Sequence, residues 1–387
     1  MQSEQHHLRI PGPSPVPPRV VRAASRPMVN HRGAAFRELY KQVTSQMRDV
    51  FQTSGEVLLI TGSGTAAMEA AVVNLVSPGE KMLALVGGKF GERWAEIGRA
   101  FGAEVIEWRY DWRRGADPAE LAARLAADPD IVAVFATHNE SSTGVMNDIE
   151  ALSRAREMGG RRHKALLVVD SISALGGAPL PMDAWGVDVV VAGSQKCLML
   201  PPGLSFVALG EAALERLERV TTGRYYLDLR AYRKAAAAGE SPYTPAVSLV
   251  FALQEALAML AEEGLENSYA RHRLMRDMVR AGMKALGLPL YTDERWASPT
   301  VTAVEGAPGL DVEAFRRLVL RQFGVELSGG QGQLKGKIFR IGHMGYAGPL
   351  DMIAALAAVE QGLAKSGFPV RLGAGVAAAQ EVWARWS

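Results

Sequence analysis

The sequence predicts an α/β fold, with a large domain built on a seven-stranded, mostly parallel sheet and a smaller α+β C-terminal domain. Three observations support this prediction. Seven short apolar runs recur between residues 57 and 210 without the polar alternation of a half-exposed strand, which indicates a sheet covered on both faces. Segments with helical periodicity separate several of these runs. After Gly210, long helical stretches alternate with short strand-like pieces.

Residues 1–30 are expected to form an N-terminal arm. Its segment Pro11–Pro18 holds five prolines in eight residues, so it cannot be helical and is expected to be extended before the first helix. The large domain is expected over residues 31–262. Its strands are predicted at Val57–Thr61, Lys81–Val86, Val105–Trp108, Ile131–Thr137, Ala165–Asp170, Asp188–Ala192 and Ser205–Leu209. Helices are predicted at Ala66–Val76, Glu92–Phe101, Pro118–Ala127 and Glu150–Glu157.

The smaller domain is expected over residues 263–387. Two long helices, Pro245–Glu263 and Leu265–Leu286, are expected to bridge the domains. The glycine-rich stretch Ser328–Gln333 is predicted to be a loop. The remaining elements are predicted as strands at Leu288–Tyr291, Thr300–Ala303 and Phe339–Ile341, and as helices at Val312–Phe323 and Pro349–Ser366.

The composition excludes several classes of protein. The 43 basic and 41 acidic side chains give a net charge of +2, which argues against a nucleic-acid binder with a basic surface. The single cysteine, Cys197, excludes an internal disulfide and a zinc site made of several cysteines. No apolar run approaches the roughly 20 residues that cross a bilayer. Met1–Arg9 is polar and does not resemble a secretory signal, so we expect a soluble, cytoplasmic protein.

The segment Gly62–Ala67 follows a predicted strand and opens a helix, so its backbone N–H groups and hydroxyls can seat a phosphate. It also matches the G-x-G-x-x-A pattern of dinucleotide-binding folds. Such a fold needs an acid at the end of the next strand. Here that strand ends in Val86–Lys89, and the nearest acid, Glu80, precedes it. The sequence therefore favours a single phosphate over a dinucleotide.

Two charged residues follow apolar strands. Asp170 ends the run Ala165–Val169, where a carboxylate is desolvated and needs a partner; the alternative is the N-cap of a following helix. Lys196 follows the strand Asp188–Ala192 and has apolar flanks. In an apolar crevice a lysine has a lowered pKa and reacts with carbonyls, whereas the alternative is a surface loop lysine.

The stretch His138–Gly144 also follows a strand. One histidine and one glutamate do not complete a set of metal ligands, so its hydroxyls and amides fit a polar ligand better and no metal site is expected. A phosphate seat, a desolvated acid and an activated lysine at neighbouring strand ends are together what pyridoxal phosphate needs. Its aldehyde forms a Schiff base with lysine, and its ring nitrogen stays protonated beside a carboxylate.

With these residues, the chain resembles the class V aminotransferases of the alanine–glyoxylate, serine–glyoxylate and serine–pyruvate branch. The resemblance covers nearly the whole chain in family order. It implies pyridoxal-phosphate fold type I and a homodimer with active sites at the subunit interface. The matching stretches are Pro11–Ser14, Gly62–Thr65, His138–Gly144, Val169–Gly177, Gly193–Lys196, Pro201–Gly203 and Phe339–Gly342.

The resemblance assigns roles around the cofactor. Lys196 would form the Schiff base, and Asp170 would pair with the ring nitrogen. Ser63, Gly64 and Thr65 would hold the phosphate, with help from Gln195 at the same end of the cofactor.

Further roles follow from the same resemblance. Phe90 would stack on the ring, at a position where many relatives carry tryptophan, and Ser141 would lie near its hydroxyl edge. Arg340 would bind the substrate carboxylate as a bidentate fork, and Gly12 would adjoin the substrate. Tyr243 and Thr244 would reach the phosphate of the neighbouring subunit.

The implied reaction transfers an amino group between alanine or serine and glyoxylate or pyruvate, by a ping-pong mechanism through an aldimine at Lys196. Another reaction on the same fold, such as aminoethylphosphonate or pyridoxamine transamination, stays open. A cysteine desulfurase is disfavoured, because the only thiol adjoins the lysine in an apolar loop. Arg32, Lys89 and Arg93 stay open as partners for a second substrate carboxylate. No nucleic-acid or membrane partner is expected.

Overall fold

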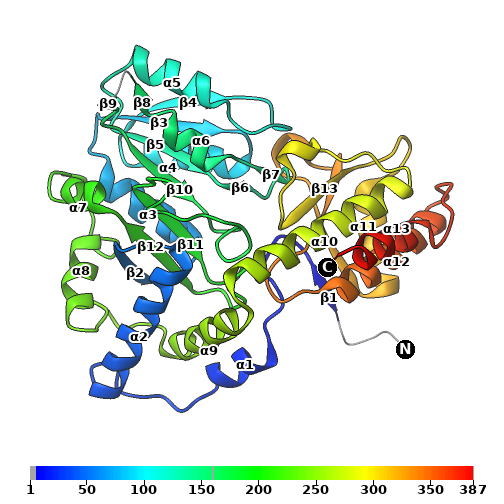
Figure 1. Ribbon diagram of the computed structural model, residues 1–387, viewed down its shortest axis with the longest axis horizontal. Helices are drawn as coiled ribbons and strands as arrows, with labels where there is room; N and C mark the ends of the chain where they lie inside the picture. The colour runs from blue at the N-terminus through cyan, green and yellow to red at the C-terminus, as the bar shows by residue number, and fades with distance from the viewer. Residues whose placement is uncertain (1–5, 159–160, 387) are drawn as a thin grey trace.

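The computed structural model describes residues 6–158 and 161–386. All seven predicted strands of the large sheet are confirmed, in the order β2-β12-β11-β10-β5-β3-β4 (Figure 1). Strand β12 runs antiparallel to both of its neighbours and the other pairs are parallel, so the sheet is mostly parallel as predicted. The strands are β2 (Glu56–Thr61), β3 (Lys81–Val86), β4 (Glu104–Arg109), β5 (Ala133–Thr137), β10 (Leu166–Asp170), β11 (Val189–Gly193) and β12 (Leu204–Leu209).

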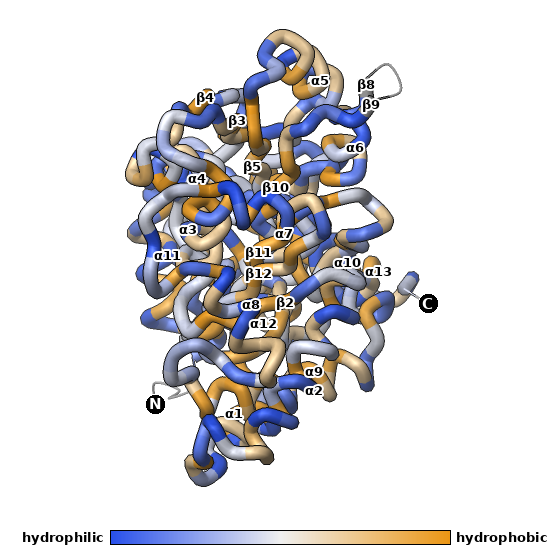
Figure 2. Tube along the Cα trace, turned by 90° about the vertical axis from the view of Figure 1, so that its left-hand side faces the viewer, coloured by the Kyte–Doolittle hydropathy of each residue, from blue (hydrophilic) through white to orange (hydrophobic). Residues whose placement is uncertain are grey.

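Helices cover both faces of this sheet. Leu167 and Val169 of β10 belong to one buried apolar cluster, whereas Leu166 and Val168 belong to another. Because successive residues of a strand point to opposite faces, the two clusters are the two layers of the core. Figure 2 shows the hydrophobic central strands β10 and β11. The helices of this part are α1 (Pro18–Ala24), α2 (Ala34–Phe51), α3 (Gly64–Leu75), α4 (Lys89–Ala100), α5 (Pro118–Ala127), α6 (Ile149–Arg154), α7 (Glu211–Leu217), α8 (Leu229–Ala237) and α9 (Val247–Glu263).

The C-terminal part has its own sheet and core. Its four strands lie in the order β1-β14-β15-β13. The first of them, His7–Arg9, pairs in parallel with Val325–Gly329, so the start of the expected arm adds a strand to this sheet. Helices pack against it and form a third apolar cluster. These elements are β1 (His7–Arg9), β13 (Val301–Glu305), β14 (Val325–Gly329), β15 (Ile338–Gly342), α10 (Leu265–Ala285), α11 (Val312–Phe323), α12 (Pro349–Lys365) and α13 (Ala374–Ala384).

Two local predictions are wrong. Leu288–Tyr291 is not a strand, because only Leu290 forms a bridge, to Val304. Ser328–Gln333 is not entirely a loop, since Ser328 and Gly329 end β14 and pair with Arg340 and Phe339 of β15. Tertiary pairing overrides the local signal of the glycines here. Among the described residues, no helix is both long and apolar enough to span a membrane.

Candidate active site

Most of the predicted site residues converge on one cavity of about 230 Å³, at the ends of the central strands and the start of α3, whereas Gly12, Arg340, Tyr243 and Thr244 are not among its lining residues. We call it the strand-end cavity. The arrangement follows from the parallel pairing of β10 with β5 and β11, which puts the carboxyl ends of these strands at one edge of the sheet. The lining residues are Ser63, Gly64, Thr65, Phe90, Arg93, Asn139, Ser141, Asp170, Ile172, Ser173, Gln195 and Lys196.

Asp170 lies at the end of β10 with only 3% of its surface exposed. One of its carboxylate oxygens accepts a hydrogen bond from the Ile172 amide at 2.8 Å. Burial raises the pKa of Asp170 to about 7, against the opposing effect of that amide. The residues that follow form turns and no helix, so the N-cap alternative is wrong. Asp170 is thus a buried carboxyl group that a cationic partner would ionise.

Lys196 follows β11 and lines the same cavity. Burial lowers the pKa of its amine to about 8, although the Asp170 carboxylate opposes this shift. The amine donates a hydrogen bond to the Pro11 carbonyl of the N-terminal segment. Gly12 has a φ of +98°, and a Cβ on it would lie 2.5 Å from the Lys196 Cδ. The surface-lysine alternative is therefore wrong, and Gly12 leaves the space that the lysine side chain occupies.

The N-terminus of α3 has the features of an anion seat. Ser63 is its N-cap residue but makes no side-chain capping bond, and no acid lies in its first turn. Gly64 allows a close approach, because a Cβ there would lie 2.7 Å from the Ile172 Cδ1. Gln195 lines the same cavity, and its side-chain NH2 group can donate a hydrogen bond. The first backbone N–H groups of α3, the positive end of the helix dipole and this amide donor fit the phosphate of pyridoxal phosphate at this end of the cavity.

Phe90 is positioned by a buried acid that sequence reasoning missed. One carboxylate oxygen of Glu140 accepts hydrogen bonds from the amides of Phe90 (3.0 Å) and Gly91 (3.1 Å). Its other oxygen accepts from the Ser142 hydroxyl at 2.5 Å and from the Ser142 amide at 3.2 Å. Burial raises the pKa of Glu140, while these donors lower it. The stretch His138–Gly144 is therefore attached to the start of α4, the helix that carries Phe90.

We expect Glu140→Ala to lower the free energy of unfolding by about 3 kcal/mol, because it leaves several buried donors without an acceptor. The measurement is chemical denaturation of the purified protein. Ser142→Ala is the comparison variant: it removes one donor to Glu140 and the acceptor of the Lys89 amide, at a smaller cost of about 2 kcal/mol. Equal, small effects of the two substitutions would show that Glu140 does not hold the two segments together.

Arg340 of β15 is only 5% exposed, so it is not a surface arginine. Its Nε donates to the Gly329 carbonyl at 2.9 Å, and one terminal nitrogen donates to the Ser141 carbonyl at 2.7 Å. No carboxylate lies within 4 Å of it among the described residues. Burial lowers the pKa of Arg340 to about 10, still well above neutrality. A buried, charged guanidinium beside the Ser141 backbone is suited to bind an anion.

Tyr243 and Thr244 do not line the strand-end cavity within one chain. The Tyr243 hydroxyl donates to the Tyr225 carbonyl at 3.0 Å, and its ring stacks on Tyr226 with centroids 4.9 Å apart. Their contact with a neighbouring subunit stays a prediction.

The cations considered for a second substrate carboxylate, Arg32, Lys89 and Arg93, differ in whether an acid pairs with them. Arg32 forms an ion pair with Glu240, and Lys89 forms one with Glu92 at 2.6 Å. Arg93 lines the cavity and has no carboxylate within 4 Å among the residues that the structure describes.

Cys197 is buried, and burial raises the pKa of its thiol to about 12, so it is not a thiolate at neutral pH. This inert thiol agrees with the argument against a desulfurase.

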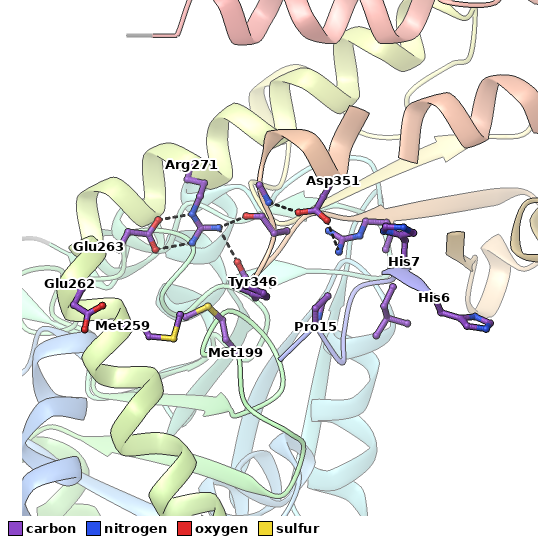
Figure 3. Close-up of a pocket in the computed structure, with 15 residues that line it drawn as sticks. His6, His7, Pro15, Met199, Met259, Glu262, Glu263, Arg271, Tyr346 and Asp351 are labelled. Carbon is purple, nitrogen blue, oxygen red and sulfur yellow. Dashed lines mark hydrogen bonds and ion pairs between the residues drawn. The ribbon is translucent and has the colours of Figure 1, made fainter. Parts of the chain in front are cut away.

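A larger cavity of about 800 Å³ lies between the N-terminal strand, α9, α10 and the loop after β15 (Figure 3). Its prominent cation, Arg271, is paired with Glu263 and also donates to the carbonyls of Gly345 and Ala347. Its size exceeds that of the strand-end cavity, but its main charges are already neutralised. It lacks a buried lysine facing an acid, so we place the chemistry in the smaller cavity.

Comparison with known proteins identifies the family of the chain. Residues 8–338 match the family model described as aminotransferase class V. The "soluble hydrogenase 42 kDa subunit" of Anabaena cylindrica is 42% identical over 97% of this chain and 98% of its own length. A serine–glyoxylate aminotransferase of Methylorubrum extorquens is 37% identical over 97% of this chain and 95% of its own.

The fold is shared with solved structures of the same kind. A ureidoglycine–glyoxylate aminotransferase from Bacillus subtilis superposes with a TM-score of 0.93, at 30% identity and with complete coverage of both chains. The cavity supplies a phosphate seat, a lysine and a buried acid, which fit pyridoxal phosphate. The chain therefore belongs to the class V aminotransferases, enzymes of fold type I whose cofactor is pyridoxal phosphate.

Proposed function

We propose that this enzyme transfers an amino group from alanine or serine to glyoxylate or pyruvate. The observation that carries the proposal is the joint placement of Lys196 and Asp170 in one cavity, with Arg340 attached to its wall through the Ser141 carbonyl. When bound, the cofactor supplies an aldehyde that reacts with amines and a ring that accepts electrons.

Each residue then has a defined task. Lys196 holds the cofactor and acts as the general base at the substrate α-carbon, because its lowered pKa of about 8 makes the free amine accessible near neutrality. The negative charge of Asp170 keeps the ring nitrogen of the cofactor protonated. Arg340 binds the substrate carboxylate, and its backbone hydrogen bonds fix its orientation. Because the amino acid and the 2-oxo acid use the same site in turn, the first product leaves before the second substrate binds, and the kinetics are ping-pong.

The choice of small substrates is supported by the serine–glyoxylate relative. The carboxylates of Glu240 and Glu92 neutralise Arg32 and Lys89, so of the three cations considered for a second substrate carboxylate, Arg93 alone stays available in the cavity. The single cysteine is too few to hold an iron–sulfur cluster, so the residues of this chain do not support the hydrogenase name of the Anabaena relative.

The test is the absorbance of the purified holoenzyme after addition of single amino acids. Alanine and serine are expected to convert the cofactor to its amine form, and glyoxylate or pyruvate to reverse the change. Parallel double-reciprocal plots are expected for the complete reaction. A response to aminoethylphosphonate or pyridoxamine alone would replace these substrates with the alternatives, and no response to any amine would contradict transamination.

The role proposed for Arg340 is tested by Arg340→Lys. A lysine keeps the charge but loses the bidentate geometry and the two backbone contacts. We expect KM for alanine to rise and kcat/KM to fall about 10- to 100-fold. An unchanged KM and kcat/KM would remove Arg340 from the substrate site.

We also propose a homodimer in which Tyr243 and Thr244 reach the neighbouring subunit. Tyr225 and Tyr226, which contact Tyr243, are 81% and 42% exposed in the single chain. Exposed aromatic side chains of this kind are common at interfaces. Sedimentation equilibrium of the holoenzyme measures the assembly, and a monomer would contradict the proposal.

A further inference from the structure

Arg93 is a cation of the strand-end cavity that forms no ion pair with an acid in the part of the chain that the structure describes. It extends from α4, one turn after Phe90, and lines the cavity with Asp170 and Lys196. Its positive charge favours the ionised form of Asp170 and disfavours the ammonium form of Lys196. A cation that lines a cavity and is removed from part of its water is favoured by an anionic partner. A free guanidinium facing a cavity therefore indicates an anionic group on a bound molecule.

The contacts of Arg93 place it at the phosphate end of the cavity. One terminal nitrogen lies 3.2 Å from the Thr65 hydroxyl, in the first turn of α3. The seat formed by Ser63, Gly64 and Thr65 contains no charged side chain of its own, although a phosphate dianion carries about two negative charges. Amides and a helix dipole compensate only part of that charge. Arg340 is held elsewhere, by the carbonyls of Gly329 and Ser141.

Arg93 also contacts the residue expected to stack on the cofactor. Its guanidinium carbon lies 4.8 Å from the centroid of the Phe90 ring. A guanidinium over one face of an aromatic ring leaves the other face available for a second planar group. The same side chain therefore links the phosphate seat to the stacking ring.

We propose that Arg93 binds the phosphate of the cofactor by charge-assisted hydrogen bonds and, through the same position, supports Phe90. The inference rests on the cofactor and not on the choice of substrates in the proposed function. Failure of alanine or serine in the substrate test would leave it unaffected.

The experiment compares two cofactors that differ only in the phosphate. Apoenzyme of the wild type, Arg93→Gln and Arg93→Lys is titrated with pyridoxal phosphate and with pyridoxal, and binding is followed by absorbance. We expect Arg93→Gln to weaken pyridoxal phosphate about 10- to 100-fold and pyridoxal less than about threefold. Arg93→Lys is expected to recover part of the loss. Inorganic phosphate should compete with pyridoxal phosphate more weakly in Arg93→Gln than in the wild type.

Arg99→Gln is the matched control, since Arg99 lies on the same helix, is exposed and pairs with Glu107. It is expected to bind both cofactors as the wild type does, and circular dichroism confirms that each variant is folded. An equal loss of affinity for both cofactors would overturn phosphate binding and leave only support of Phe90. Unchanged cofactor affinity would overturn the proposal, and a raised KM confined to dicarboxylic substrates would then assign Arg93 to the substrate.

Discussion

Replacing Lys196 by alanine is expected to lower kcat by at least about 1000-fold and to abolish the visible absorbance of lysine-bound cofactor. The size of the effect reflects the loss of both the covalent attachment and the general base, each of which contributes orders of magnitude to catalysis. No other amine lines the strand-end cavity among the described residues, so none is placed to replace it. Absorbance spectra and steady-state rates of the purified variant measure both effects.

Lys196→Arg separates charge from reactivity. Arginine keeps a cation beside Asp170 but stays protonated and forms no Schiff base. We expect it to be as inactive as Lys196→Ala, although it retains the favourable charge. Lys365→Ala, on the last turn of α12, is the matched control and should behave as the wild type. Normal turnover and normal absorbance in Lys196→Ala would exclude a lysine-dependent transaminase.

The sequence was sufficient to predict the parts of the site that depend on strand ends. Lys196 and Asp170 each follow an unbroken apolar strand, and parallel pairing brings such ends together whatever the details of packing. The phosphate seat is equally local, because residues Ser63–Thr65 form the start of one helix. Such features depend on only a few consecutive residues, so the local sequence pattern is enough to predict them.

The parts that were missed depend on contacts between distant segments. Glu140 looked like one polar residue of a loop, and its role appears only when the start of α4 packs against it, 50 residues away in sequence. Strand β1 was hidden for a related reason, since it pairs with β14 more than 300 residues later. Arg93 could not be distinguished from Arg32 and Lys89 until their ion pairs were visible.

Asp170→Asn is expected to lower kcat/KM at least about 100-fold while Lys196 still binds the cofactor. An amide has nearly the same shape and can still accept the Ile172 amide hydrogen bond, but it cannot supply the negative charge that keeps the ring nitrogen protonated. Activity should therefore fall much more than cofactor affinity. Loss of cofactor binding with no further loss of kcat in the loaded variant would contradict this role.

Asp170→Asn is expected to lower activity but to raise the stability of the apoenzyme. The raised pKa of Asp170 determines the direction of this stability change. Burial raises the pKa of Asp170 to about 7 from 3.8 in a free chain, so the folded apoenzyme binds more protons than the unfolded chain between these values. Its stability must then fall as the pH rises from about 4 to about 7, by at most about 4 kcal/mol from this group. Asp170→Asn lacks this loss and should have the higher unfolding midpoint at pH 8, whereas the unfolding midpoints of the two apoproteins should converge near pH 4.

A cationic ring nitrogen stabilises the ionised carboxylate, so binding the cofactor should remove the stability advantage of the variant. Unfolding midpoints across this pH range, with and without cofactor, measure the coupling, and a difference between the two proteins that does not vary with pH would show that Asp170 is not the proton-binding group of the empty site.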